Sequence, residues 1–166
     1  MSTPGRPERA RFDLRVLAGG RTGSAAPADD ERDARIRHVL VVDDDPLSRG
    51  LYETVLCRLV GDALQVHAFA DPAQALAFAR PHRIELAVVD LHLGAGQMTG
   101  LALIERLRTE SPAGDRLSAI LVTADTEPMV IYEATRQGVP LVLEKAVDLH
   151  RFMLRCAALL DIDLPA

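Results

Sequence analysis

The sequence predicts an α/β domain in which a parallel five-stranded sheet is covered by helices on both faces. Five short apolar runs, rich in Val, Leu, Ile and Ala, are typical of strands buried on both faces. Each run is followed by a segment whose apolar residues recur at helical spacing. The connections are short, so successive strands run parallel, and right-handed crossovers place helices on both sides of the sheet.

The first two strand and helix units have clear boundaries. The strand predicted at 38–42 ends in acids, and the helix predicted at 46–60 stops at Gly61. A second strand is predicted at 66–69. The Asp-Pro pair that follows supplies an N-cap and a proline at the first helical position, which predicts a helix at 72–80.

The second half of the chain repeats this alternation three times. Strands are predicted at 86–90, 119–123 and 141–143, and helices at 99–109, 128–137 and 148–160. A Ser-Pro pair ends the first of these helices, a glycine ends the second, and an Asp opens the third. Because the last helix ends close to the last residue, we expect no attached output domain.

Residues 1–36 differ in composition from the rest. They combine prolines, a Gly-Gly pair and mixed charges, a composition typical of flexible segments. We therefore predict a flexible extension at 1–36 and one folded domain at 37–163.

Composition excludes several classes of protein. The net charge of −5 argues against nucleic-acid binding. No apolar run is long enough for a membrane span, and the Arg-rich N-terminus lacks the apolar region of a secretory signal. Cys57 and Cys156 both lie in apolar helical patterns, which favours buried free thiols in a reducing, cytoplasmic location.

Polar residues collect where four of the predicted strands end. The first strand ends in Asp43, Asp44 and an adjacent third acid, and the third ends in Asp90. The fourth ends in Thr123, and the fifth in a Glu followed by Lys145, the single lysine among 19 basic residues. The carboxyl ends of parallel strands share one edge, so these groups should meet there.

This set of residues indicates phosphoryl chemistry. Clustered carboxylates repel one another unless a cation joins them, and an all-oxygen ligand set suits Mg²⁺. One carboxylate can then act as the nucleophile that forms an aspartyl phosphate. A hydroxyl and an ammonium can hold the phosphoryl oxygens.

Four segments resemble the receiver domains of bacterial two-component response regulators. They are Val39–Pro46 with Arg49 after it, Val88–Leu91, Leu121–Ala124 and Leu143–Lys145. The resemblance covers about 38–161. It implies a flavodoxin-like (βα)5 fold with strand order 2-1-3-4-5. It also implies a phosphorylation-dependent switch in a phosphorelay, one that labels itself and turns over no substrate as an enzyme does.

The resemblance assigns roles to individual residues. Asp90 is the implied phospho-acceptor and a metal ligand. Asp44 is an implied direct Mg²⁺ ligand, Asp43 a ligand acting largely through water, and the backbone carbonyl of His92 a further one. Thr123 is the implied switch hydroxyl. For Lys145, the resemblance implies an ammonium that binds the phosphoryl group.

Two further positions tune the lifetime of the phosphate in this family, and here they hold His92 and Asp125. We hypothesise that this pair controls the access of water to the phospho-aspartate. Ordinary exposed polar residues are the alternative. The implied phosphodonors are a histidine kinase, a histidine phosphotransfer protein or a small acyl phosphate. The output is expected through an unidentified downstream protein, with a homodimer left open.

The chain departs from the family pattern in three places. The loop at 94–100 is two residues longer, with Gly94 where the family usually has proline. Ala146 replaces the usual cis proline after Lys145, so we predict a trans peptide and a less tightly held lysine. Val142 stands where the family often has the aromatic ring that moves during switching.

Three alternatives remain open from the sequence. The missing proline and ring allow a receiver-like interaction domain that works without phosphorylation. Glycines 94, 96 and 100 lie between a strand and a helix, which hints at nucleotide binding, although the G-x-G-x-x-G spacing is not met. A phosphatase that forms an aspartyl phosphate would commonly have a second Asp where this chain has His92.

Overall fold

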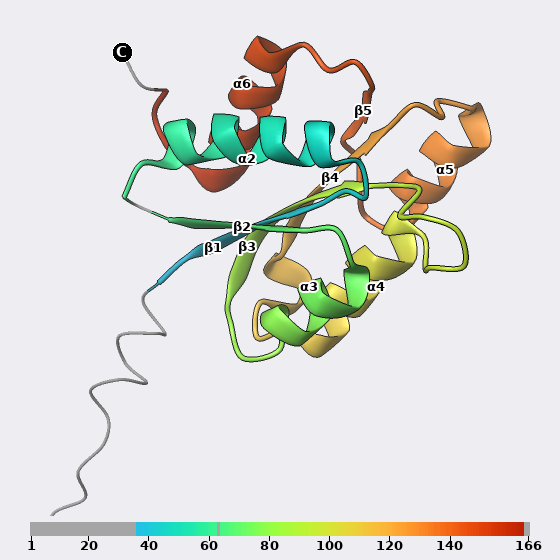
Figure 1. The fold of residues 1–166 in the computed structure, drawn as a ribbon, viewed down its shortest axis with the longest axis horizontal. Coiled ribbons are helices and arrows are strands. Elements are labelled where there is room, and N and C mark those ends of the chain that lie inside the picture. Colours follow the sequence, from blue (N-terminus) through green and yellow to red (C-terminus); the bar gives the residue numbers. More distant parts are fainter. Residues whose placement is uncertain (1–35, 63, 165–166) are drawn as a thin grey trace, which may run out of the picture.

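The computed structural model of the protein describes residues 36–62 and 64–164, and within them the expected alternation of strands and helices is confirmed (Figure 1). The elements are β1 (His38–Val42), α2 (Pro46–Val60), β2 (Gln65–Phe69), α3 (Pro72–Ala79), β3 (Ile84–Asp90), α4 (Gly100–Glu110), the short 3₁₀ helix η1 (Gly114–Arg116), β4 (Ser118–Thr123), α5 (Pro128–Arg136), β5 (Val142–Glu144) and α6 (Leu149–Leu160). The predicted ends differ from these by at most two residues, and η1 was not predicted. The extension predicted at 1–36 lies outside the described residues except for residue 36.

In the described part of the chain, the strands form one parallel sheet in the order β2-β1-β3-β4-β5. This confirms the flavodoxin-like fold. The register pairs Val42 with Val89 on the neighbouring strand, and Thr123 with Glu144. Residues that directly follow these strands therefore reach the same edge of the sheet.

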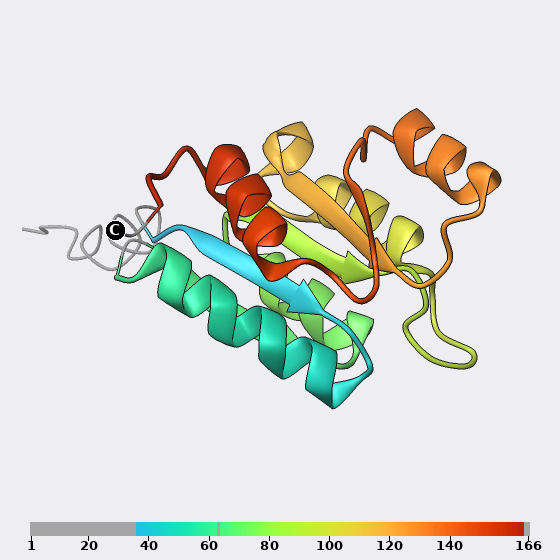
Figure 2. The same cartoon turned by 90° about the horizontal axis from the view of Figure 1, so that it is seen from above.

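Helices cover both faces of the sheet (Figure 2). Successive residues of a strand point to opposite faces, and the core divides accordingly into two apolar clusters. One cluster packs Leu40 and Val89 against α3, α4 and α5. The other packs Val41 and Val88 against α2 and α6. Within the described ranges, no helix is long and apolar enough to cross a membrane.

The helices begin where side chains cap them. The Asp45 carboxylate accepts a hydrogen bond from the amide of Ser48 at 2.8 Å, and Asp71 accepts one from Ala73 at 2.8 Å. These caps satisfy amides that have no partner inside the helix. The Asp45 cap fixes the start of α2 directly after the acidic end of β1.

Both cysteines are free thiols, but only one is buried. Cys156 lies in the core beside α2, whereas Cys57 is exposed, so the expectation of two buried thiols was wrong for Cys57. Cys57 directly follows the buried Leu56 on α2 and faces outward. Apolar spacing alone does not separate a position inside the apolar stripe of a helix from one at its margin.

The two thiols should differ strongly in reactivity. Burial raises the pKa of Cys156 to about 12, so this thiol stays protonated as well as inaccessible. We expect a maleimide to label Cys57 in the native protein, and Cys156 on the order of 100-fold more slowly, through transient opening. Mass spectrometry of the wild type and of Cys57→Ser measures both rates. Equal native labelling of the two thiols would contradict the buried placement of Cys156.

Candidate functional site

Four strand ends meet at one edge of the sheet. Asp43 follows β1, Asp90 ends β3, Thr123 ends β4, and Lys145 follows β5. The first three are buried, with exposed fractions of 1%, 7% and 0%. Three polar residues buried together at one edge need partners for their hydrogen bonds and charges.

Lys145 joins these strand ends. Its Nζ donates to Oδ2 of Asp43 at 2.8 Å and to Oδ2 of Asp90 at 2.7 Å. Its backbone amide donates to the carbonyl of Thr123 at 2.9 Å. Burial lowers the pKa of Lys145, but the hydrogen bonds to the two carboxylates outweigh it and raise that pKa above its ordinary value. The site therefore holds a permanent ammonium between two carboxylates.

The carboxylates form an oxygen-rich group that suits a hard cation. Oxygens of Asp43, Asp44 and Asp90 lie within 4.8 Å of one another. Burial raises the pKa of Asp43, and hydrogen bonds from Lys145 and from the amide of Asp45 offset this only in part. A divalent cation beside Asp43 would favour its charged form, so these residues fit Mg²⁺.

Two neighbours fix the backbone around this group. The amide of His92 donates to Oδ1 of Asp90 at 3.3 Å, which places the His92 backbone beside that carboxylate. The Arg49 guanidinium donates to the carbonyls of Asp43 at 2.7 Å and Asp44 at 3.3 Å. The sequence interpretation noted Arg49 but gave it no role. A contact between Arg49 and the backbone of the acids could have been predicted, since Arg49 lies on the first turn of α2, directly after them.

Thr123, Asp125 and His92 lie close to one another, where the segments after β3 and β4 meet. The amide of Asp125 donates to Oγ1 of Thr123 at 3.0 Å, and the amide of Glu127 donates to Oδ1 of Asp125 at 3.1 Å. The ring Nε2 of His92 lies 3.7 Å from Oδ2 of Asp125. Because Thr123 accepts through its oxygen, its hydroxyl hydrogen stays available to a further acceptor.

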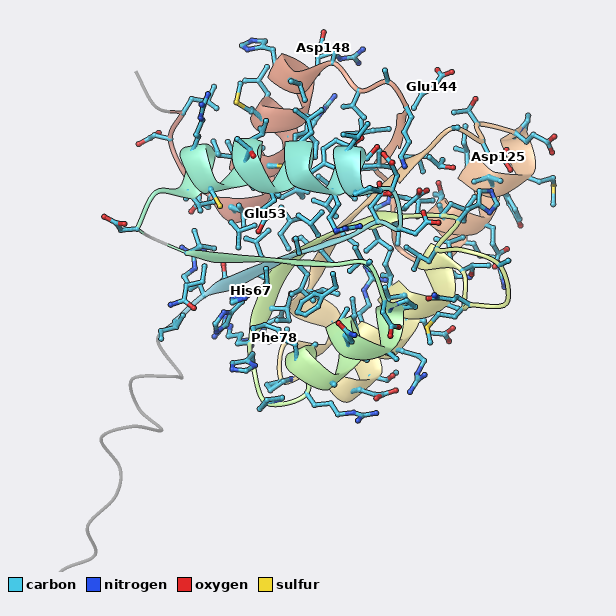
Figure 3. All side chains as sticks on the ribbon, in the orientation of Figure 1. Glu53, His67, Phe78, Asp125, Glu144 and Asp148 are labelled. Carbon is cyan, nitrogen blue, oxygen red and sulfur yellow. The ribbon has the colours of Figure 1, made fainter. Side chains whose placement is uncertain are left out.

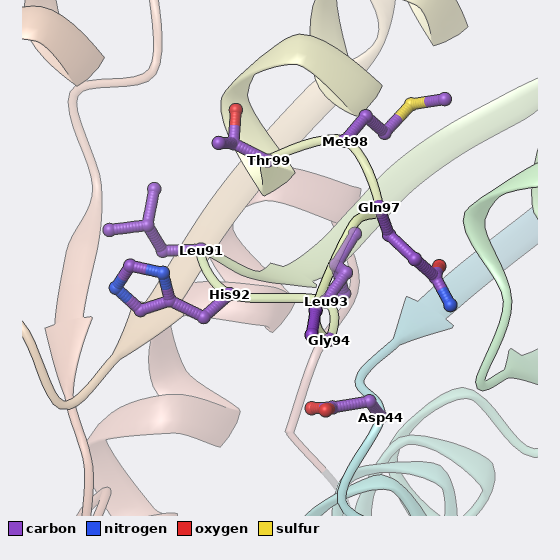
Figure 4. Close-up of a pocket in the computed structure, with 9 residues that line it drawn as sticks. Asp44, Leu91, His92, Leu93, Gly94, Gln97, Met98 and Thr99 are labelled. Carbon is purple, nitrogen blue, oxygen red and sulfur yellow. The ribbon is translucent and has the colours of Figure 1, made fainter.

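The long loop after β3 encloses a cavity beside Asp44. Gly94 and Gly96 have φ of 97° and 77°, and the amide of Gln97 donates to the carbonyl of Gly94 at 3.3 Å. The cavity holds about 390 Å³. Its lining consists of Asp44, Leu91, His92, Leu93, Gly94, Ala95, Gln97, Met98 and Thr99. Figure 4 shows Gln97 extending from the loop toward the end of β1 that carries Asp44.

Gly100 brings α4 against the backbone of Asp90. Its amide donates to the carbonyl of Leu91 at 2.8 Å. A Cβ at this position would lie 2.1 Å from the carbonyl oxygen of Asp90 and 2.8 Å from its carbonyl carbon. Only glycine permits this approach, so the start of α4 and the Asp90 backbone form one rigid unit.

Comparison with known proteins agrees with this geometry. The sequence model of the response regulator receiver domain matches residues 39–157. The chain belongs to the response regulator receiver domain family.

One curated relative of this receiver domain is much longer than the chain. The cyclic di-GMP phosphodiesterase response regulator RpfG of Xanthomonas campestris pv. campestris is 27% identical over 125 residues, which are 75% of this chain. The chain spans only 32% of that relative's length.

Solved structures share the fold. The signal receiver domain of an HD domain-containing protein from Pseudomonas fluorescens matches with a TM-score of 0.65 and 25% identity. That match covers 76% of this chain and 88% of the other. A response regulator from Burkholderia pseudomallei, with a phosphorylated aspartic acid, calcium ion and citrate, matches with a TM-score of 0.60 and 26% identity. Here the match covers 74% of this chain and 66% of the other.

The receiver domain departs from expectation after Lys145. The Lys145–Ala146 peptide is cis, so the predicted trans peptide was wrong. The expected looser lysine was also wrong, because its ammonium contacts both Asp43 and Asp90. The prediction considered only the preference of an isolated peptide, whereas Lys145 is held by its amide and by its side chain.

Val142 lies on β5 opposite Leu121 and packs, half-buried, against the cluster under α3, α4 and α5. Its small aliphatic side chain cannot supply the ring movement that an aromatic residue would.

Proposed function

We propose that this receiver domain is a phosphorylation-dependent signalling switch of a two-component phosphorelay, with Asp90 as the phospho-acceptor. The observation that carries the proposal is the Lys145 ammonium held between the buried Asp90 and Asp43 carboxylates. Burying these charges costs desolvation free energy, which an ion pair without a function would offset poorly. A charge that counters an incoming phosphoryl group gives this arrangement a role.

In the proposed reaction an oxygen of Asp90 attacks the phosphorus of a phosphohistidine or acyl phosphate. The P–N or P–O bond to the donor breaks, and the donor leaves with that electron pair. Lys145 turns its ammonium toward a phosphoryl oxygen, and the Thr123 hydroxyl donates to another. Asp43, Asp44, Asp90 and the backbone carbonyl of His92 would hold Mg²⁺, which when bound offsets the charge of the phosphoryl oxygens.

The Burkholderia relative supports the chemistry. That structure carries a phosphorylated aspartic acid and a calcium ion, and it is 26% identical to this chain. Calcium, like magnesium, is a hard cation that prefers oxygen ligands. The acidic group at Asp43, Asp44 and Asp90 offers the same donor type.

Intact mass after incubation with acetyl phosphate and Mg²⁺ tests the proposal. We expect one phosphoryl adduct, lost in Asp90→Asn and in the presence of EDTA. Asp62→Asn is the matched control and should keep the adduct, because Asp62 is exposed just beyond the C-terminal end of α2, whereas the site lies at the start of that helix. Failure of both acetyl phosphate and beryllofluoride to bind would favour a domain that docks without phosphorylation.

The pair formed by His92 and Asp125 should control the lifetime of the phosphate. Their side chains lie 3.7 Å apart, and the His92 amide donates to the Asp90 carboxylate, so the pair is close enough to order or exclude the attacking water. Replacing both with Ala should change the rate of dephosphorylation about tenfold. The loss of phosphate, timed by intact mass after removal of the donor, measures this effect. An unchanged half-life would make the two residues ordinary surface groups.

We propose a histidine kinase or a histidine phosphotransfer protein as the donor, and a downstream protein or a second copy of the chain as the receiver of the signal. Helix α5 follows the Thr123 loop and exposes large apolar side chains, with Met129 69% and Tyr132 61% exposed. Such a face supports signalling by protein contact. The two free thiols fit the proposed cytoplasmic location, where cysteines stay reduced.

A further inference from the structure

A second cavity lies at the opposite end of the sheet from Asp90. It holds about 220 Å³ and is lined by Arg37, Arg83, Ile84, Glu85, Ala113, Arg116, Ser118 and Leu159. Ile84 and Ser118 are the first residues of β3 and β4, whereas Asp90 and Thr123 are the last. Figure 3 shows this separation of ends, with Asp125 and Glu144 toward one end and His67 and Phe78 toward the other.

The charge of this cavity is opposite to that of the chain. Three arginines and one glutamate line it, although the whole protein carries a net charge of −5. Arg37 forms an ion pair with Glu85 and donates to the carbonyl of Leu160 at 3.1 Å. The one acid is therefore already neutralised, and Arg37 is held in place.

The other two arginines of the cavity, Arg83 and Arg116, differ from Arg37 in their contacts. Arg83 lies in the turn before β3 and Arg116 in η1, and both are exposed. Among the residues that the structure describes, neither guanidinium has a hydrogen-bond or ion-pair partner. Two unpaired guanidinium groups on separate segments, around one concave site, favour an anion with several oxygens.

The other residues that line the cavity indicate the chemical class of its ligand. Ser118 lies in the lining and can offer a hydroxyl, and the 40% exposed Leu159 is the apolar lining side chain that presents surface to the cavity, since Ile84 and Ala113 are buried. Drug-sized ligands occupy about 300–1,000 Å³, so this cavity suits a smaller molecule. We propose that the cavity binds a small phosphate monoester, with its phosphate between Arg83 and Arg116 and its carbon portion against Leu159.

Binding would be independent of the phosphorylation site. The cavity joins the turn before β3, the η1 segment and the end of α6, so an occupant would hold these segments together. A ligand that binds only the folded protein raises its stability by mass action. A phosphorylated metabolite could therefore stabilise the domain whether or not Asp90 is modified.

The test uses the full chain with Asp90→Asn and EDTA, so that the acceptor site cannot contribute. Glycerol 3-phosphate and inorganic phosphate are titrated, with chloride at matched ionic strength, and followed by amide NMR and thermal unfolding. We expect saturable shifts at 83–85 and 113–118, with glycerol 3-phosphate binding more tightly than phosphate. Equal affinity would overturn the proposed contact of the carbon portion with Leu159 and reduce the site to one for free phosphate.

Variants locate the site. Arg83→Gln together with Arg116→Gln should weaken binding at least tenfold. Arg58→Gln with Arg155→Gln removes the same charge from exposed positions on α2 and α6, and should leave binding unchanged. An equal loss of affinity in both double variants would show a general effect of charge and would overturn the proposed site. Shifts confined to residues 43–45 and 90–100, or no saturation, would likewise overturn the proposal.

Discussion

Replacing Lys145 with Met should slow phosphorylation of Asp90 by about 10²–10³-fold, the range seen when one preorganised charge-stabilising donor is removed. Lys145 is the only lysine in the chain, and its ammonium contacts both Asp43 and Asp90. Methionine keeps much of its length and apolar stem but cannot counter the charge of the phosphoryl group. A time course of intact mass with acetyl phosphate and Mg²⁺ measures the rate.

The same variant should not weaken the binding of Mg²⁺. The lysine competes with a cation for Asp43 and Asp90, so its removal should leave magnesium affinity equal or higher, as calorimetry would show. Lys145→Arg keeps the charge but replaces a compact ammonium with a planar fork, and should recover only part of the rate. A normal rate in Lys145→Met would contradict the role given to the ammonium.

Replacing Gly100 with Ala should destabilise the domain by about 1–3 kcal/mol and slow phosphorylation. The added methyl group would lie 2.1 Å from the carbonyl oxygen of Asp90 and 3.0 Å from Cγ1 of Val89. Either α4 or the end of β3, which carries Asp90, must move. Thermal unfolding should show a Tm lower by several degrees.

Gly50 provides the matched control for this variant. It lies inside α2, and a Cβ there meets nothing within 4 Å. Gly50→Ala should therefore stabilise the protein by about 0.5–1 kcal/mol, because alanine is the better helix former. If Gly100→Ala behaved in the same way, the tight approach of α4 to Asp90 would not exist in solution.

The order of elements was predictable because the three central strands β1, β3 and β4 are buried on both faces. Strands such as Val39–Val42 and Leu86–Val89 therefore consist of unbroken apolar runs. The edge residues were predictable for a related reason. Polar residues that directly follow buried parallel strands must lie at the carboxyl edge of the sheet.

What the sequence left out depends on contacts between distant segments. The tight hold on Lys145 involves Asp43 directly after β1, Asp90 on β3 and Thr123 on β4. The exposure of Cys57 depends on how far neighbouring elements extend over α2. The arginines of the second cavity lie far apart in the chain, so no local pattern marked them as a group.

The bond between Lys145 and Asp43 spans 102 residues of sequence, and that between Lys145 and Asp90 spans 55. During synthesis the chain exposes Asp43 and Asp90 long before it exposes Lys145. The acceptor therefore lacks its ammonium until β5 has left the ribosome and docked against β4. Under the proposed function, a nascent or partly unfolded chain would not accept a phosphoryl group efficiently, which limits signalling to molecules that have finished folding.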